Sequence, residues 1–490
     1  MLKSISTAEF YIQRRWQLLY HRLLTIAQIV WVQRLVIITA VLLISIALPL
    51  VLSRTRLLLV IGMVLAVTAV LIFLYKPPLG LFLLVGASLV LPSPDLPGGL
   101  NLTVLFLLLL IALWFLEMFI VQRNIWVVRS RPVKPLLALL LVVIISLFFG
   151  QLPWFRHAQP APLETQIGGL LIFICAVGAF LLVAQQIREL YWLQWMTWVY
   201  IAMSAFFVAG WVVPGVGPIS SRLFHIGAIS NSLFWTWLVA LAFGQAVFND
   251  KLKPFWRLVL LGVTAMTLFV GFVLNSEWKS GFLPPMAAVA VILALRSWRL
   301  GLLMVLVAPV AAYILTSQAI ATDDYSYGTR VDAWIIMFEI IKVNPLLGLG
   351  PANYYWYTPL FPIRGWAVSF NSHNQYVDII AQAGLLGMVC VIWFAIEQGL
   401  LGWRLKDRVP SGFARAYVYC VLGGLVGTLV GGLLADWFFP FVYNIGYYGF
   451  RGAIPAWLFL GGLVSLEQMY ANPSAEAVGT SQTGAHASFT

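Results

Sequence analysis

Long apolar runs recur along the whole chain and are separated by short polar or basic segments. They lie at about 35–52, 57–75, 79–91, 101–121, 136–150, 167–184, 191–213, 228–248, 258–275, 281–295, 301–317, 384–403, 416–435 and 452–467. A helix needs roughly 20 apolar residues to cross the hydrocarbon core of a bilayer. The pattern therefore predicts an all-α polytopic transmembrane helical bundle. We expect 12–14 crossings, because the runs at 79–91, 136–150 and 281–295 are short.

Composition and charge agree with a membrane protein. Hydrophobic residues make up 62% of the 490 residues and charged residues only 9%, against about 25% charged in an ordinary soluble domain. This excludes a soluble globular chain and a disordered one. With the N-terminus in the cytoplasm, 20 of the 29 Lys and Arg residues fall inside and nine outside, as the positive-inside rule requires. The net charge of +12 is therefore a sign of topology and does not indicate nucleic-acid binding.

The same patterns predict the domain organisation. Residues 1–34 are basic and amphipathic, which is typical of a segment on the cytoplasmic membrane surface. Residues 35–470 form the transmembrane domain, and about 318–383 are expected to be one large external loop that contains short helices. The tail 471–490 is rich in small polar residues and is expected to be disordered. No Cys/His cluster has the spacing of a zinc site, and we expect no metal and no cofactor.

The large loop carries its own structural signals. Residues 328–343 have helical periodicity, and Asn344-Pro345 should stop that helix. Its expected apolar face consists of Val331, Trp334, Ile335, Phe338 and Ile341. Gly348 and Gly350 indicate a tight turn, and a second helix is expected from Ser372-His373 to a stop at Gly384.

Aromatic residues are concentrated between the two expected loop helices. The segment 354–366 includes Tyr354 and Trp356 and is interrupted by prolines. Such residues could stack on sugar faces, or they could anchor the loop at the membrane–water interface. The sequence leaves both interpretations open.

Three cations on the predicted external side could bind a large anion. They are Arg222, Lys279 and Arg330, and a phosphate group is the obvious ligand for such a set. The alternative is that they only contact lipid headgroups. His225 follows Arg222 closely and could line the same site, or it could simply pack within its loop.

His373 is the most specific candidate for chemistry. Ser372 or Asn371 is a natural helix N-cap, which would place His373 in the first helical turn. The helix dipole there disfavours an imidazolium, so the ring should stay neutral and able to accept a proton. The competing interpretation is a capping or interfacial histidine.

Three motifs around this histidine resemble a known family. They are Asn344-Pro-Leu-Leu-Gly-Leu-Gly350, then Phe370-Asn-Ser-His-Asn-Gln-Tyr376, then Ala383-Gly-Leu-Leu-Gly387. Together they are similar to the signature of the O-antigen ligase and O-antigen polymerase superfamily of membrane glycosyltransferases. The detailed similarity covers about 60 residues, and the topology extends it loosely over the chain.

The resemblance implies a function and a set of residue roles. Such proteins transfer a glycan from a polyprenyl-pyrophosphate carrier to a glycan or glycolipid acceptor hydroxyl, without a metal, at the external face of the plasma (inner) membrane. The family's proposed base falls on His373, followed by Asn374. Its pyrophosphate-binding arginines fall on Arg330 and Arg222. Lys279 stands where the family often has Arg, which leaves the role of Lys279 open.

Several points stay open on the sequence. The acceptor decides whether the reaction is ligation, polymerisation or protein glycosylation, and nothing in the chain separates these. The rival class is a transporter of a lipid-linked glycan or a small anion, which should show broken mid-membrane helices or paired repeats. A scaffold with an inactive site is disfavoured by the presence of Arg222, Arg330 and His373 together. The identity of the glycan and the oligomeric state are not predicted.

Overall fold

The computed structural model describes residues 67–94, 96–303, 306, 317 and 324–470. The chain divides into two units, Met1–Ile72 and Phe73–Thr490. Only residues 67–72 of the first unit are described, as part of a helix, and the bundle and its polar site belong to the second unit. The predictions for 1–34, for the run at 35–52 and for the tail 471–490 fall outside the described residues.

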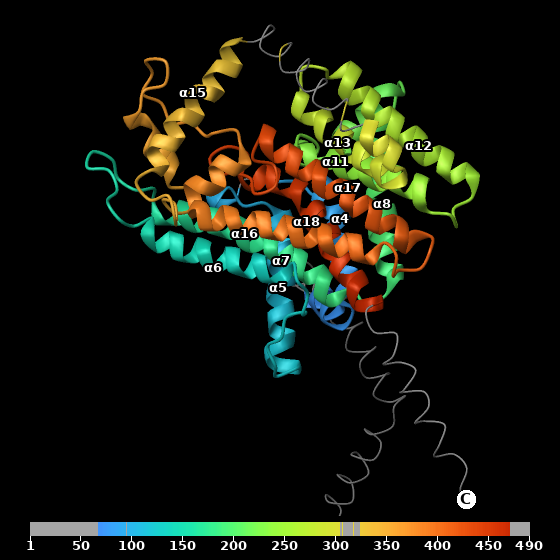
Figure 1. Cartoon of the computed structure of the whole chain (residues 1–490). Coiled ribbons are helices and arrows are strands. Elements are labelled where there is room, and N and C mark those ends of the chain that lie inside the picture. The colour runs from blue at the N-terminus through green and yellow to red at the C-terminus, as the bar shows by residue number, and fades with distance from the viewer. Residues whose placement is uncertain (1–66, 95, 304–305, 307–316, 318–323, 471–490) are drawn as a thin grey trace, which may run out of the picture. The chain divides into compact units, whose positions relative to one another are not determined.

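The described part of the chain is all-α and contains no strand, as predicted (Figure 1). The helices of the bundle are α4 (Pro77–Val90), α5 (Leu102–Leu116), α6 (Val133–Phe149), α7 (Leu163–Gln186), α8 (Leu190–Val212), α9 (Gly217–Leu223), α10 (Ile226–Ile229), α11 (Ser232–Phe248), α12 (Pro254–Phe269), α13 (Lys279–Arg296), α16 (Gln375–Leu405), α17 (Phe413–Leu434) and α18 (Gly446–Tyr470). The large loop before α16 contains α15 (Asp324–Ile341) and two short 3₁₀ turns, Tyr354–Trp356 and Thr358–Leu360.

Eight helices in the described ranges are long and apolar enough to cross a membrane. A ninth is added if the bent pair Val67–Tyr75 and Pro77–Val90 forms one span. The helices α6 and α11 are apolar but have only 17 residues each. Because the runs at 35–52, 57–75 and 301–317 lie wholly or mostly outside the described residues, the expectation of 12–14 crossings stays a prediction.

The last helix, α18, is the central element of the bundle. Its whole apolar window is buried by neighbouring helices, whereas only 28% of the corresponding window of α12 is buried. Two adjacent glycines allow this close packing. A Cβ on Gly461 would lie 2.3 Å from the carbonyl oxygen of Phe180 in α7, and one on Gly462 would lie 2.2 Å from the hydroxyl of Tyr417 in α17. Small residues commonly bring membrane helices together in this way.

Hydrogen bonds between helix ends define two opposite ends of the bundle. Asn101, before α5, donates a 2.6 Å hydrogen bond to the carbonyl of Tyr447 at the start of α18. At the opposite end, Ser130 donates to Glu467 near the end of α18 at 2.5 Å. The starts of α5, α11, α16 and α18 and the end of α17 thus meet at one end of the bundle, which we call the site end.

The helix α15 is correctly predicted, but its buried face only in part: Ile341 is buried and Trp334 packs on the loop core. The buried apolar residues are Ala333, Met337, Ile340 and Ile341, whereas Ile335 and Phe338 are exposed. Met337, Ile340 and Ile341 pack with Leu349, Tyr354 and Tyr357 in the core of the loop. The apolar side chains on both sides of this helix made the orientation ambiguous from sequence.

Candidate active site

His373 lies one residue before the cap of α16. The cap is Asn374, whose side-chain oxygen accepts hydrogen bonds from the amides of Tyr376 at 3.0 Å and Val377 at 3.4 Å. The prediction of Ser372 or Asn371 as the cap, with His373 in the first turn, is therefore wrong. His373 is exposed and has a left-handed backbone with φ of 47°, which is uncommon for a residue other than glycine.

Both neighbours of His373 are fixed by hydrogen bonds. The Ser372 hydroxyl accepts the amide of Asn374 at 3.1 Å and donates to the carboxylate of Asp378 at 2.8 Å. The Ser372 carbonyl accepts the indole N–H of Trp334 in α15 at 2.8 Å. The loop before α16 is thus tied to α16 on one side and to α15 on the other.

Arg330, on α15, is the cation whose charge acts on this histidine. Its Nη1 lies 3.5 Å from the carbonyl oxygen of Leu434, and the Asn374 side chain donates to the carbonyl of Leu433 at 3.4 Å. Both groups therefore meet the last turn of α17. The pKa of His373 is lowered from its ordinary value, first by desolvation within the loop and then by the positive charge of Arg330. A lowered pKa was expected, but its causes differ from the helix dipole that the sequence suggested.

Two buried carboxylates lie behind the histidine loop. Asp378 and Asp436 are both fully buried. Asp378 also accepts the hydroxyl of Tyr354 at 2.5 Å, and Asp436 accepts the amide of Phe441 and the side chain of Asn444, each at 2.7 Å. Burial raises the pKa of Asp436 to about 6. Asp378 was not singled out from sequence, because nothing marks an Asp five residues after a histidine as buried.

Tyr354 and Trp356 have different environments. Tyr354 is fully buried, bonded to Asp378 and stacked on Phe441 with ring centroids 4.6 Å apart. Its ring is thus occupied within the core of the loop and is not open to a sugar. Trp356 is 41% exposed, and its indole N–H donates to the hydroxyl of Tyr443. Of the two, only Trp356 presents ring surface to solvent.

Lys279, Arg222 and His225 lie elsewhere at the site end. Lys279 is the first residue of α13 and follows Trp278, whose ring packs edge-on against Trp437 at 6.5 Å, next to Asp436. Arg222 is exposed at the end of α9.

His225 is the N-cap of the helix α10, which packs on α4 and α18. Its Nδ1 accepts the amide of Gly227 at 3.0 Å, and its ring packs edge-on against Tyr448. Burial, and then the charge of the nearby Arg451, lower the pKa of His225 to about 4. These contacts are those of a helix cap, which is the packing role considered from sequence. The structure brings Arg330 and the loop of His373 to the same turn of α17, and it describes no contact that brings Arg222 or His225 to them.

The two glycine motifs meet where the loop 345–350 is hydrogen-bonded to α16. The first helical segment of α16 stops at Gly384, as predicted, where φ is 68° and ψ is −171°. A second segment then runs from this break to Leu405. At this break Leu385 donates to the carbonyl of Pro345 at 2.8 Å and Leu386 to that of Leu346 at 3.2 Å.

The loop returns the same number of hydrogen bonds to the helix. Leu349 donates to the carbonyl of Ala381 at 2.8 Å, and Gly350 donates to that of Gln382 at 3.1 Å. In an unbroken helix these two carbonyls would accept the amides of residues 385 and 386. The loop 345–350 therefore replaces the helical hydrogen bonds that the break removes.

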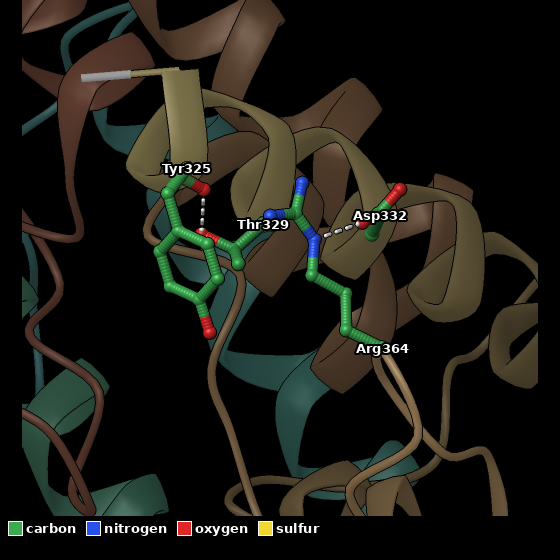
Figure 2. Close-up of polar contacts among 4 residues, drawn as sticks. All are labelled: Tyr325, Thr329, Asp332 and Arg364. Carbon is green, nitrogen blue, oxygen red and sulfur yellow. Dashed lines mark hydrogen bonds and ion pairs between the residues drawn. The ribbon is translucent and has the colours of Figure 1, made fainter.

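The rest of the large loop is clipped onto α15 by Arg364. Its guanidinium lies over the ring of Tyr325 at 4.8 Å and pairs with Asp332 at 2.8 Å (Figure 2). Gly328 makes room for it, since a Cβ there would lie 2.0 Å from Nη2 of Arg364. This clip holds the segment that follows Trp356 against the helix that carries Arg330.

The fold and the site together define a multi-pass helical membrane protein with a loop-built polar site at one end of the bundle. Residues 236–392 match the family model described as O-Antigen ligase. The match confirms the resemblance to the O-antigen ligase superfamily and supports a glycosyl-transfer type of enzyme. It includes Lys279, Arg330 and His373 and both glycine motifs, but not Arg222 or His225. A search of curated proteins found no match.

Proposed function

We propose that the protein transfers a glycan from a polyprenyl-pyrophosphate carrier to an acceptor hydroxyl at the external, periplasmic face of the inner membrane. The observation that carries this proposal is that Arg330 and Asn374, the residue after His373, both contact the last turn of α17. Arg330 and His373 also both lie in the segment that matches the O-antigen ligase family. A fixed cation next to a neutral imidazole suits a reaction in which an anion leaves while a hydroxyl loses its proton.

In the proposed reaction His373 is the general base. A ring nitrogen takes the proton of the acceptor hydroxyl as that oxygen forms a bond to the anomeric carbon. The bond between the anomeric carbon and the pyrophosphate oxygen breaks, and its electron pair leaves with the lipid pyrophosphate. Direct displacement inverts the anomeric centre. The lowered pKa of His373 keeps the ring unprotonated near neutral pH.

The cations balance the charge that grows on the leaving group. Arg330 would contact the pyrophosphate nearest the reacting carbon, because it is the cation next to His373. Arg222 and Lys279, on neighbouring segments of the site end, would contact the more distant phosphate oxygens. An arginine offers a planar fork that matches phosphate geometry, whereas a lysine offers a point charge.

A transporter is the competing function, and the break in α16 bears on it. Broken membrane helices in transporters expose backbone groups to a substrate cavity. Beside Gly384 the backbone amides and carbonyls are instead hydrogen-bonded to the loop 345–350. They are therefore not free to coordinate a transported ion. This favours the enzyme.

The test is a reconstituted transfer reaction. The purified full-length protein is mixed with a lipid-pyrophosphate glycan and with candidate acceptors, and release of lipid pyrophosphate is followed with formation of the glycosylated acceptor. We expect stoichiometric release and transfer with one class of acceptor. Movement of intact donor across sealed vesicles, without cleavage, would support the transporter instead.

A further inference from the structure

The backbone of His373 has an unusual left-handed conformation. A left-handed φ of 47° is costly for a residue with a Cβ, and such conformations persist where the surrounding structure over-determines them. Here the residues on both sides are held. Asn374 caps α16 with its side-chain oxygen. Ser372 is bonded through both its hydroxyl and its carbonyl.

The bonds of Ser372 converge on Asp378. Its Oδ1 accepts the hydroxyl of Ser372 at 2.8 Å and the hydroxyl of Tyr354 at 2.5 Å. Tyr354 is in turn fixed by burial and by its stacking on Phe441. Asp378 therefore connects the histidine loop to the rigid core of the large loop through two hydroxyl groups.

Asp378 is unsuited to direct chemistry. It is fully buried, so no substrate reaches it. The ion pairs among the described residues are Lys342–Glu339, Arg364–Asp332 and Lys406–Asp407, and none of them involves Asp378. Its Oδ2 has no hydrogen-bond partner within the described ranges, and the nearby Asp436 is another buried carboxylate. What Asp378 supplies to its surroundings is thus one oxygen that accepts two hydroxyl donors.

We propose that Asp378 is a positioning residue that holds His373 in its left-handed conformation, acting through the hydroxyl of Ser372. The proposal rests on the proposed role of His373 as the base. It assigns to Asp378 the function of a hydrogen-bond acceptor, for which a negative charge is not required. An asparagine at this position keeps an oxygen that can accept both hydroxyls, whereas an alanine keeps none.

The test compares Asp378→Asn, Asp378→Ala, Ser372→Ala and Tyr354→Phe in the purified full-length protein. Two matched controls remove buried hydroxyls elsewhere: Ser465→Ala, whose hydroxyl bonds the carbonyl of Ile187, and Tyr417→Phe, whose hydroxyl bonds that of Phe459. The readouts are kcat, the Kd of the lipid-pyrophosphate donor, and the hydrogen-exchange rate of the peptide 370–378.

We expect Asp378→Ala and Ser372→Ala to lower kcat by about 10- to 100-fold, the scale of a misplaced catalytic group. The donor Kd should be unchanged, since neither residue faces the anion. Exchange of the 370–378 peptide should become faster. Tyr354→Phe should show a weaker form of the same effect, Asp378→Asn should resemble the wild type, and both controls should leave kcat and this exchange rate unchanged.

Two results would overturn the proposal. Asp378→Asn as slow as Asp378→Ala would mean that the negative charge is needed, and wild-type kcat and exchange in Asp378→Ala would remove the positioning role. The variant His373→Ala in the same assay separates the positioning role of Asp378 from the proposed function. A wild-type kcat in His373→Ala would contradict the role of His373 as the general base. A slow His373→Ala with a fast Asp378→Ala contradicts the positioning role alone. If Asp378→Ala does not fold, Ser372→Ala against Ser465→Ala decides the question.

Discussion

Gly384 lies directly against Leu346: a Cβ built on Gly384 would sit 2.1 Å from the carbonyl oxygen of Leu346. The approach is mutual, because a Cβ on Gly348 would lie 2.6 Å from the amide nitrogen of Gly384. Both glycines have positive φ. The two motifs thus encode one joint, in which a loop replaces a missing turn of hydrogen bonds inside a 31-residue helix.

Substitution of Gly384 by Ala should destabilise the protein. Its φ and ψ fall in a region that is essentially restricted to glycine, which costs about 1–3 kcal/mol for other residues, and the contact with Leu346 adds a steric clash. We expect a lower thermal midpoint in detergent and faster proteolysis of the large loop. Gly399→Ala is the matched control in the same helix, because an added Cβ there meets nothing within 4 Å. Equal thermal midpoints for the two variants would contradict the joint.

Much of the fold could be predicted from sequence, because apolar runs of the right length have few alternatives in a bilayer. The described helices match the expected runs closely. Gly348 and Gly350 were expected in a tight turn, and both have positive φ. The stop at Gly384 was also predicted, but the contact that forms there was not, because a glycine that ends a helix does not reveal its partner in sequence. The partner loop 345–350, whose hydrogen bonds to α16 span 32 to 40 residues of sequence, supplies the hydrogen bonds that hold the two segments of α16 together.

The site was predicted in part for a similar reason. Its cations and histidine are visible in sequence as rare polar residues in an apolar chain. Asp378 is not, and the role of Tyr354 as its hydrogen-bond donor is recognised only by their mutual contact. The cap was misassigned because Ser372, Asn371 and Asn374 are all good N-caps. The engagement of Ser372 with Asp378 leaves Asn374 to cap the helix.

The large loop should react with reagents added from outside the cell. Val368 is exposed on this loop, and Arg408 is exposed between α16 and α17. We expect Val368→Cys to be labelled in intact cells by a membrane-impermeant maleimide, and Arg408→Cys to be labelled only after lysis. The three natural cysteines are buried, so the background should be low. The reverse pattern would place Arg330 and His373 in the cytoplasm and contradict the proposed function.

Removal of the Arg330 or Arg222 guanidinium should weaken donor binding. A charge-assisted hydrogen bond contributes about 1.5–3 kcal/mol, so each Arg→Ala variant should raise the donor Kd at least about tenfold. Arg330→Lys should remain impaired because it loses the planar fork. The measurement is binding of a lipid-pyrophosphate glycan to purified protein.

Arg364→Ala is the control for these two variants. It removes an arginine of the same loop whose guanidinium is already bound to Asp332 and Tyr325 (Figure 2). It should leave the donor Kd near the wild-type value. Wild-type donor affinity in the Arg330 and Arg222 alanine variants would make these arginines headgroup contacts.

His373→Ala should lower kcat by about 10²–10⁴-fold, the usual contribution of a general base, with little change in donor Kd. His373→Gln keeps hydrogen-bonding capacity but cannot accept the proton near neutral pH, so it should be nearly as slow. Near-wild-type turnover in His373→Gln would mean that the ring only orients the acceptor. Rates are measured under donor saturation, so that binding and chemistry are separated.

The pH dependence of kcat tests the pairing of His373 with Arg330. A base works only when unprotonated, so the wild-type rate should fall as the pH drops through the pKa of His373. Desolvation and the charge of Arg330 lower this pKa, which places the fall below the ordinary value of about 6.5. Arg330→Gln removes the positive charge, so the pKa should rise and the acid limb should move to higher pH. The fall in kcat at low pH should be present in the wild type and absent in His373→Gln, which would assign it to His373. If the midpoint of this fall is the same in Arg330→Gln as in the wild type, the two side chains do not interact in the working enzyme.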